Sequence, residues 1–148
     1  YAVGDHERLI GDVRAQVPPG GSLSAQFNLA SHFTDRMQLY QFPDRVGEVE
    51  LVLLDLTEAY RDRPEFKLFW LEYTLQVKVP RFVEAARGLL TDKRYGLVLA
   101  RDGFLLFRRG ASDAADRAAA RALLEARAAA WLAYTGRGYG RARHVWDK

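Results

Sequence analysis

The order of hydrophobic and polar positions along the chain is typical of an α/β fold. Residues 5–17 carry apolar side chains with a helical period, and the Pro-Pro-Gly-Gly run after them predicts the end of that helix. Residues 22–27 and 37–42 resemble short strands, and residues 29–36 between them predict a helix of about two turns. Residues 49–56 form a nearly continuous apolar run, as expected of a strand that is buried on both faces.

The order strand–helix–strand implies parallel pairing with a right-handed crossover. The loop between residues 42 and 49 is short for a second crossover. We therefore expect the strand at residues 22–27 to lie between the other two strands.

The second half of the chain predicts a helix over residues 79–93, a hairpin and a long helix. Residues 95–110 contain two β-rich runs around Asp102-Gly103, which is a strong turn signal. An alanine-rich helix follows, which Ser112 is expected to cap and Gly136 to end. The predicted fold class is α/β: a small three-layer, Rossmann-like, mostly parallel sheet with a C-terminal antiparallel hairpin and a long C-terminal helix.

Composition fits a single globular α/β domain over residues 1–148. Of the 148 residues, 49% are hydrophobic and 28% are charged, which is a globular rather than a disordered composition. The expected parts are a core at 1–112, the alanine-rich helix at 113–136 and a basic tail at 137–148. No run of about 18 apolar residues predicts a membrane span, and the abrupt start without methionine suggests a piece of a longer or processed chain.

Several kinds of chemistry are excluded by what the sequence lacks. There is no cysteine, which excludes disulfides, thiolate zinc sites, iron–sulfur clusters and a cysteine nucleophile. The three histidines, at positions 6, 32 and 144, are far apart in the sequence, so no metal site is expected. The usual dinucleotide, P-loop and nucleophile-elbow motifs are absent, and no cofactor is expected.

Two stretches are candidates for a surface that meets a membrane or another domain. Residues 65–77 are dense in aromatic and aliphatic side chains, which is typical either of a helix packed on the sheet or of such a contact surface. The end of the chain concentrates arginines, which either attract anionic groups or form a solvated terminus. No nucleic-acid partner is expected. The candidate surface residues are Phe66, Phe69, Trp70, Arg137, Arg141 and Arg143.

A polar stripe provides the candidate ligand site. Asn28, His32 and Arg36 are spaced by four residues, which places them on one face of a helix. Asp55 ends a neighbouring parallel strand and is expected at the same edge of the sheet, where ligands of open α/β folds collect. These four residues could bind a phosphorylated or sugar ligand, with His32 as acid or base.

A structural interpretation of the same residues remains open. Asn28 then caps the helix, His32 bonds a backbone carbonyl, and Arg36 pairs with Asp55 or Asp35. No complete catalytic set is visible in the sequence, so the chain is not predicted to be an enzyme on its residues alone.

Three stretches, at residues 21–43, 49–56 and 95–110, resemble the C-terminal region of a family of bacterial multi-spanning membrane proteins. The family is called domain of unknown function 2079. The resemblance covers about residues 8–110, and the chain departs from the family pattern at Ser31, Phe33 and Thr34. The matching residues are Ser24, Ala25, Asn28, Leu29, His32, Arg36, Tyr40, Phe42, Pro43, Asp55, Tyr95, Gly96, Asp102, Gly103, Arg109 and Gly110.

The resemblance implies a setting at the extracytoplasmic face of the cell membrane, as part of a longer protein. Family members look like glycosyltransferases that take sugars from polyprenyl-phosphate carriers, with the catalytic carboxylate expected in the membrane half. The implied partners are that membrane-spanning half and a lipid-linked sugar, and no catalytic residue is carried over to this chain.

Three functions therefore remain. The leading one is an accessory domain that recognises an acceptor or a lipid-linked donor, or stabilises the membrane half. The second is a stand-alone module that binds a sugar or phosphate ligand at the Asn28, His32 and Asp55 edge. The third is an enzyme that uses His32 as a base.

Overall fold

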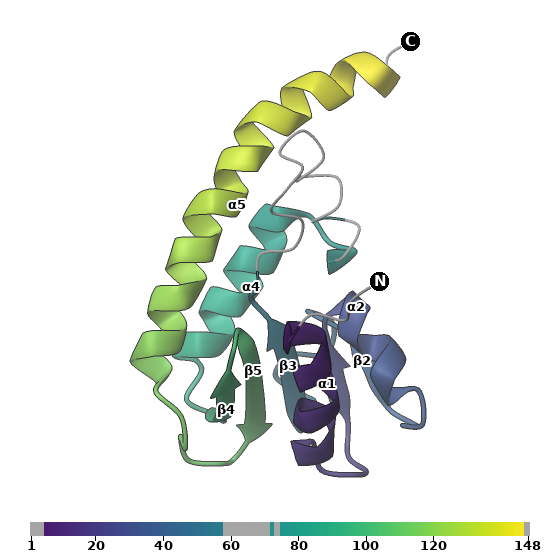
Figure 1. Cartoon of the computed structure of the whole chain (residues 1–148), viewed down its shortest axis with the longest axis vertical. Coiled ribbons are helices and arrows are strands. Elements are labelled where there is room, and N and C mark those ends of the chain that lie inside the picture. The colour runs from purple at the N-terminus through teal and green to yellow at the C-terminus, as the bar shows by residue number, and fades with distance from the viewer. Residues whose placement is uncertain (1–4, 58–71, 73–74, 147–148) are drawn as a thin grey trace.

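Five strands form one mixed β-sheet in the order β2-β1-β3-β5-β4 (Figure 1). The computed structural model describes the backbone of residues 5–57, 72 and 75–146, and the side chains of residues 8–57, 72, 75–133 and 135. The strands are β1 (Leu23–Ala25), β2 (Leu39–Gln41), β3 (Leu51–Asp55), β4 (Tyr95–Arg101) and β5 (Phe104–Arg109). The helices are α1 (Asp5–Gln16), α2 (Phe27–Ala30), the 3-10 turn η1 (Ser31–Phe33), α4 (Val79–Thr91) and α5 (Arg117–Trp146).

The predicted central place of the strand at residues 22–27 is confirmed. That strand, β1, pairs in parallel with β2 on one side and with β3 on the other. β5 runs antiparallel to both β3 and β4, so it alone opposes the direction of the other described strands. The sheet is therefore mixed, with the predicted C-terminal antiparallel hairpin at one side.

The Asp-Gly pair determines the backbone conformation at the tip of this hairpin. Asp102 and Gly103 both have positive φ, at 49° and 89°, which is the geometry of a tight two-residue turn. A Cβ on Gly103 would lie 2.6 Å from Thr57 Oγ1, so only glycine allows the hairpin tip to approach the end of β3 this closely. The Leu56 N–H donates to the Gly103 carbonyl at 2.9 Å and fixes that approach.

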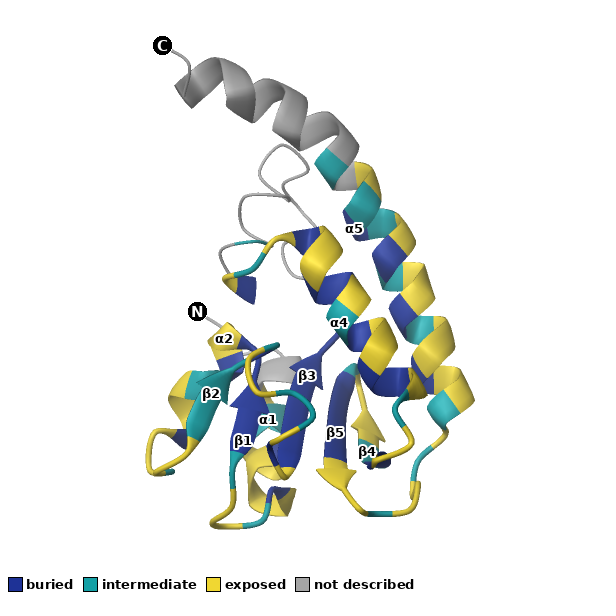
Figure 2. Cartoon of the chain, turned by 180° about the vertical axis from the view of Figure 1, so that it is seen from behind, coloured by how far each residue is buried: buried dark blue, intermediate teal, exposed yellow. Residues whose placement is uncertain are grey.

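One face of the sheet is covered by α4 and α5 (Figures 1 and 2). Phe82 of α4 stands edge-on against Phe42 and Trp131, with ring centroids 5.3 Å and 5.9 Å away. The alternate side chains Val52 and Leu54 of β3 point into the same hydrophobic cluster. This cluster joins the parallel half of the sheet to the C-terminal helix.

The opposite face is covered by α1 and by the α2–η1 segment. Val13 and Val17 of α1 are buried there, as the helical period predicts, together with Leu29 and Phe33. The other set of alternate residues of β3, represented by Leu53, packs against them. Both faces of β3 are therefore buried, which confirms the prediction from its continuous apolar run.

The alanine-rich helix differs from its prediction at both ends. It begins at Arg117 rather than near Ser112, because Asp116 Oδ1 accepts the Ala119 N–H at 3.0 Å and caps its first turn. It continues through Gly136 to Trp146, so the predicted stop at Gly136 is wrong and most of the expected basic tail is helical. Gly136, and Gly138 and Gly140 after it, each cost the helix only about 1 kcal/mol, and a glycine does not end a helix without a left-handed backbone. No helix in the described ranges has both the length and the hydrophobicity to cross a membrane.

Hydrogen bonds from arginine side chains connect α5 to α4, to β4 and to the residue after β3. Arg87 of α4 binds both carboxylate oxygens of Glu125 at 2.7 Å and 2.8 Å. Arg117 donates to the carbonyls of Leu90 and Tyr95, and Arg127 donates to the Leu56 carbonyl at 2.8 Å. The first half of α5 is therefore bonded to the end of α4, to β4 and to the residue that follows β3.

Candidate functional site

Gln26 and Asp55, which follow β1 and end β3, are joined at the carboxyl edge of the parallel strands. The Asp55 N–H donates to Gln26 Oε1 at 3.0 Å, and Asp55 Oδ1 accepts the Thr57 N–H at 2.9 Å. Both side chains are buried, Gln26 to 3% and Asp55 to 9% exposure. Polar side chains are thus buried at the edge where the sequence predicts a ligand site. Gln26 was not among the predicted residues, although its place directly after a buried strand could have pointed to it.

Asn28 and His32 lie on the surface beyond this edge. The prediction of Asn28 as the helix cap is wrong, because α2 begins at Phe27 with Gln26 in the cap position and Asn28 inside the helix. The expected single helix is also wrong, since α2 ends at Ala30 and a 3-10 turn carries the exposed His32. Leu29 of α2 and Phe33 of η1 are buried under the sheet, and the tighter winding of the 3-10 turn breaks the four-residue spacing of the polar side chains.

Arg36 lies at the other end of the parallel strands. Its Nη1 donates to the carbonyls of Gly20 at 2.5 Å and Gly21 at 3.2 Å, and its Nη2 donates to the Pro18 carbonyl. These carbonyls precede β1, whereas Asp55 ends β3, so the structure does not bring Arg36 and Asp55 together. The expected pairing of Arg36 with an aspartate is replaced by bonds to this loop. A ligand role for Asn28, His32, Arg36 and Asp55 stays a prediction.

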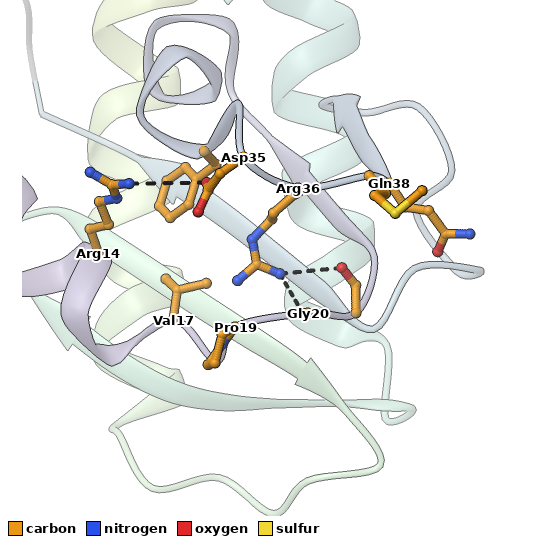
Figure 3. A pocket seen from close by; sticks show the side chains of 10 residues that line it. Arg14, Val17, Pro19, Gly20, Asp35, Arg36 and Gln38 are labelled. Carbon is orange, nitrogen blue, oxygen red and sulfur yellow. Dashed lines mark hydrogen bonds and ion pairs between the residues drawn. The ribbon is translucent and has the colours of Figure 1, made fainter.

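Beside Arg36 the structure has a pocket of about 700 Å³, which we call the loop pocket (Figure 3). It lies between the end of α1, the Pro-Pro-Gly-Gly loop and the segment from η1 to β2. Arg14 and Asp35 face each other across 4.0 Å at its rim, and Arg36 points toward the loop at Gly20. The lining residues are Arg14, Val17, Pro19, Gly20, Gly21, Phe33, Asp35, Arg36, Met37 and Gln38.

The predicted contact surface is not defined by the structure. Phe66, Phe69 and Trp70 lie outside the described residues. The backbone at Arg137, Arg141 and Arg143 belongs to α5, but their side chains also lie outside the described part. Their role in meeting a membrane or a partner stays a prediction.

In the described part of the chain, a strongly lowered carboxyl pKa belongs to Asp113, in an ion pair that holds the fold. Hydrogen bonds from Arg117 and from the Leu97 N–H lower the pKa of Asp113 to about 2. A bidentate bond from Arg87 lowers the pKa of Glu125. Within the described ranges, no group of three histidine, aspartate or glutamate side chains is placed to hold a metal ion.

No protein-family model, curated protein or solved structure matches the chain. The residues on which the expected family resemblance rests can be placed in the structure. Ser24 Oγ donates to the Asp44 carbonyl at 2.8 Å, and the Tyr95 hydroxyl donates to the Val49 carbonyl at 2.6 Å. With Arg36, they connect the loops that flank β1 and β3 to the sheet. In this chain these positions have structural roles that can be named.

Proposed function

We propose that the chain is an extracytoplasmic accessory domain of a multi-spanning membrane protein. The parent protein would resemble the glycosyltransferases that use polyprenyl-phosphate sugars, and the partner of this domain would be the membrane-spanning half. We also propose that helices on both faces of the sheet make the fold a Rossmann-like, three-layer arrangement. The domain would support recognition of donor or acceptor, or the stability of the membrane half.

The proposal rests on the structural roles of the residues that match the family pattern. Ser24, Arg36 and Tyr95 each bond a backbone group of a loop, and Gly96 and Gly103 allow backbone segments to approach closely. A pattern made of such residues specifies a sheet and its loops. This favours shared architecture with the family and an accessory role over a reaction centre within this chain.

Reporter fusions to the complete gene product test the location. Alkaline phosphatase, which is active outside the cytoplasm, and green fluorescent protein, which does not fluoresce after export in unfolded form, are fused after Lys148. We expect active phosphatase and dark fluorescent protein, with the product in the membrane fraction. Bright fluorescent protein together with a product outside the membrane fraction would refute the proposed setting.

A His32→Ala variant of the complete protein separates the accessory role from the enzyme alternative. Because His32 is exposed, the variant is expected to fold like the wild type. Sugar transfer from a polyprenyl-phosphate donor by membranes is then expected to be unchanged, and to fall when residues 8–148 are deleted. Loss of transfer in a normally folded His32→Ala variant would favour the enzyme instead.

A further inference from the structure

The loop pocket contains a guanidinium group with free hydrogen-bonding capacity. Arg36 has five N–H groups, of which two on Nη1 and one on Nη2 bond the loop carbonyls. In the described contacts its Nε–H and one Nη2–H have no acceptor, and no carboxylate pairs with it. The Pro18, Gly20 and Gly21 carbonyls thus hold the guanidinium in place without neutralising its charge. Such a pre-positioned pair of donors suits two oxygens of a carboxylate or a phosphate group.

A second guanidinium at the rim adds positive charge. Arg14 is 55% exposed, and its distance of 4.0 Å from Asp35, itself 76% exposed, is long for an ion pair. Exposed pairs of this kind contribute little, so a ligand anion could replace Asp35 at small cost. Counting the lining side chains, two guanidinium groups face one carboxylate, and the pocket carries net positive charge.

Part of the remaining pocket lining is apolar. Val17 and Phe33 form its floor and are almost completely buried, while Pro19 stands exposed at the side. Met37 is fully exposed at the rim, at 102%, although a large apolar side chain gains nothing from water. A methionine is flexible and polarizable, and it can fold over an apolar ligand. The volume lies within the range of about 300–1,000 Å³ that is usual for small-molecule sites.

We propose that the loop pocket binds a small organic oxyanion, a carboxylate or a phosphate attached to an apolar body. The oxyanion accepts the remaining Arg36 donors and pairs with Arg14. The apolar body lies against Pro19 and over Val17 and Phe33, under the side chain of Met37. This site is separate from the proposed role at the membrane and does not depend on it.

Four small probes test the proposal by titration of the ¹⁵N-labelled chain, followed by ¹H–¹⁵N NMR. Benzoate and phenyl phosphate carry both features, inorganic phosphate carries only the charge, and benzyl alcohol carries only the apolar body. We expect benzoate, phenyl phosphate or both to shift the amide signals of Gly20, Gly21 and Phe33. Their affinity is expected to exceed that of either single-feature probe by about tenfold, and which of the two binds identifies the oxyanion.

Two matched variants distinguish binding in the loop pocket from non-specific attraction of anions to a basic protein. Arg14→Gln removes an exposed charge with little effect on folding and is expected to weaken binding by about tenfold. Arg81→Gln, on the exposed side of α4, removes the same charge on the face of the sheet opposite α1 and is expected to leave binding unchanged. Arg36 itself is a poor first test because its loss also frees the loop.

Three results would overturn the proposal. The first is that none of the probes shifts the Gly20 and Gly21 signals. The second is equal weakening by Arg14→Gln and Arg81→Gln, which would mean non-specific charge attraction. The third is inorganic phosphate binding as tightly as phenyl phosphate, which would leave no role for the apolar floor.

Discussion

The guanidinium of Arg36 and the carboxylate of Asp55 lie at opposite ends of the parallel strands. Arg36 bonds the carbonyls that lead into β1, and Asp55 closes the end of β3 with the Thr57 N–H. Arg36 therefore satisfies carbonyls of the loop before β1, and Asp55 satisfies a backbone N–H directly after β3, so the two side chains bond separate loops. Among the described residues, polar groups thus gather at both ends of the same strands.

Replacing Arg36 should destabilise the loop before β1. Arg36→Ala removes three bonds to carbonyls, and we expect the free energy of unfolding to fall by about 1–3 kcal/mol. Urea unfolding of the two chains measures this loss. Arg81→Ala, an exposed arginine with no described partner, is the matched control and should lie within about 0.5 kcal/mol of wild type. Equal effects of the two variants would show that the Arg36 bonds do not stabilise the fold.

The Tyr95 hydroxyl should stabilise the loop before β3. It donates to the Val49 carbonyl at 2.6 Å and accepts the Gly47 N–H at 3.0 Å. Tyr95→Phe keeps the buried ring and leaves both groups without a partner, at a cost of about 1–3 kcal/mol. Hydrogen exchange of the Gly47 amide should also become faster. Tyr40→Phe, on a partly exposed ring, should change neither quantity.

Gly96 should be intolerant of any side chain. A Cβ at this position would lie 2.3 Å from the Ala111 carbonyl oxygen, which belongs to the backbone of the segment that covers β4. Gly96→Ala should therefore lower the free energy of unfolding by about 1–3 kcal/mol or more. Gly88→Ala, in the middle of α4 with nothing within 4 Å of the added carbon, should raise it by about 0.5–1 kcal/mol. The same sign for both variants would contradict the packing described at Ala111.

Asp113 should stabilise the fold in a pH-dependent way. Its folded pKa of about 2 lies below its ordinary value of 3.8, so its contribution is complete above pH 3.8 and disappears as the pH falls through about 2. The difference in melting temperature between wild type and Asp113→Asn should thus be largest near neutral pH and vanish near pH 2. Asp12→Asn, at an exposed pair 3.8 Å from Arg101, should show little difference throughout. A difference that stays constant from pH 7 to pH 2 would refute this role.

Much of the fold could be predicted because local signals agree with the tertiary structure. The continuous apolar run at β3, the Asp102-Gly103 turn and the period of α1 each predict an element that the structure contains. The central place of β1 between β2 and β3 followed from loop length and the handedness of crossovers. The ends of α5 could not be predicted, since Asp116 competes with Ser112 as a cap and a glycine such as Gly136 does not by itself decide a helix end.

The candidate site was harder to predict because the spacing of polar residues was interpreted as a single helix. Burial of Phe33 winds the segment into a 3-10 turn, and Arg36 then reaches the loop before β1 instead of the end of β3. The carbonyls that hold Arg36 belong to the backbone, and a sequence pattern does not show which side chain a carbonyl will meet. The loop pocket joins parts of the chain that no local motif connects.

The bonds of Arg127 and the packing of Trp131 determine how much of the chain can fold by itself. Arg127 reaches a carbonyl 71 positions earlier in the chain, directly after β3, and Trp131 completes the cluster around Phe82. The stretch for which we expect the family resemblance ends near residue 110. That stretch therefore cannot be an autonomous folding unit, because its main core would be open to water. A domain boundary placed there would cut the molecule through its core, and any excised unit must include α5 at least as far as Trp131.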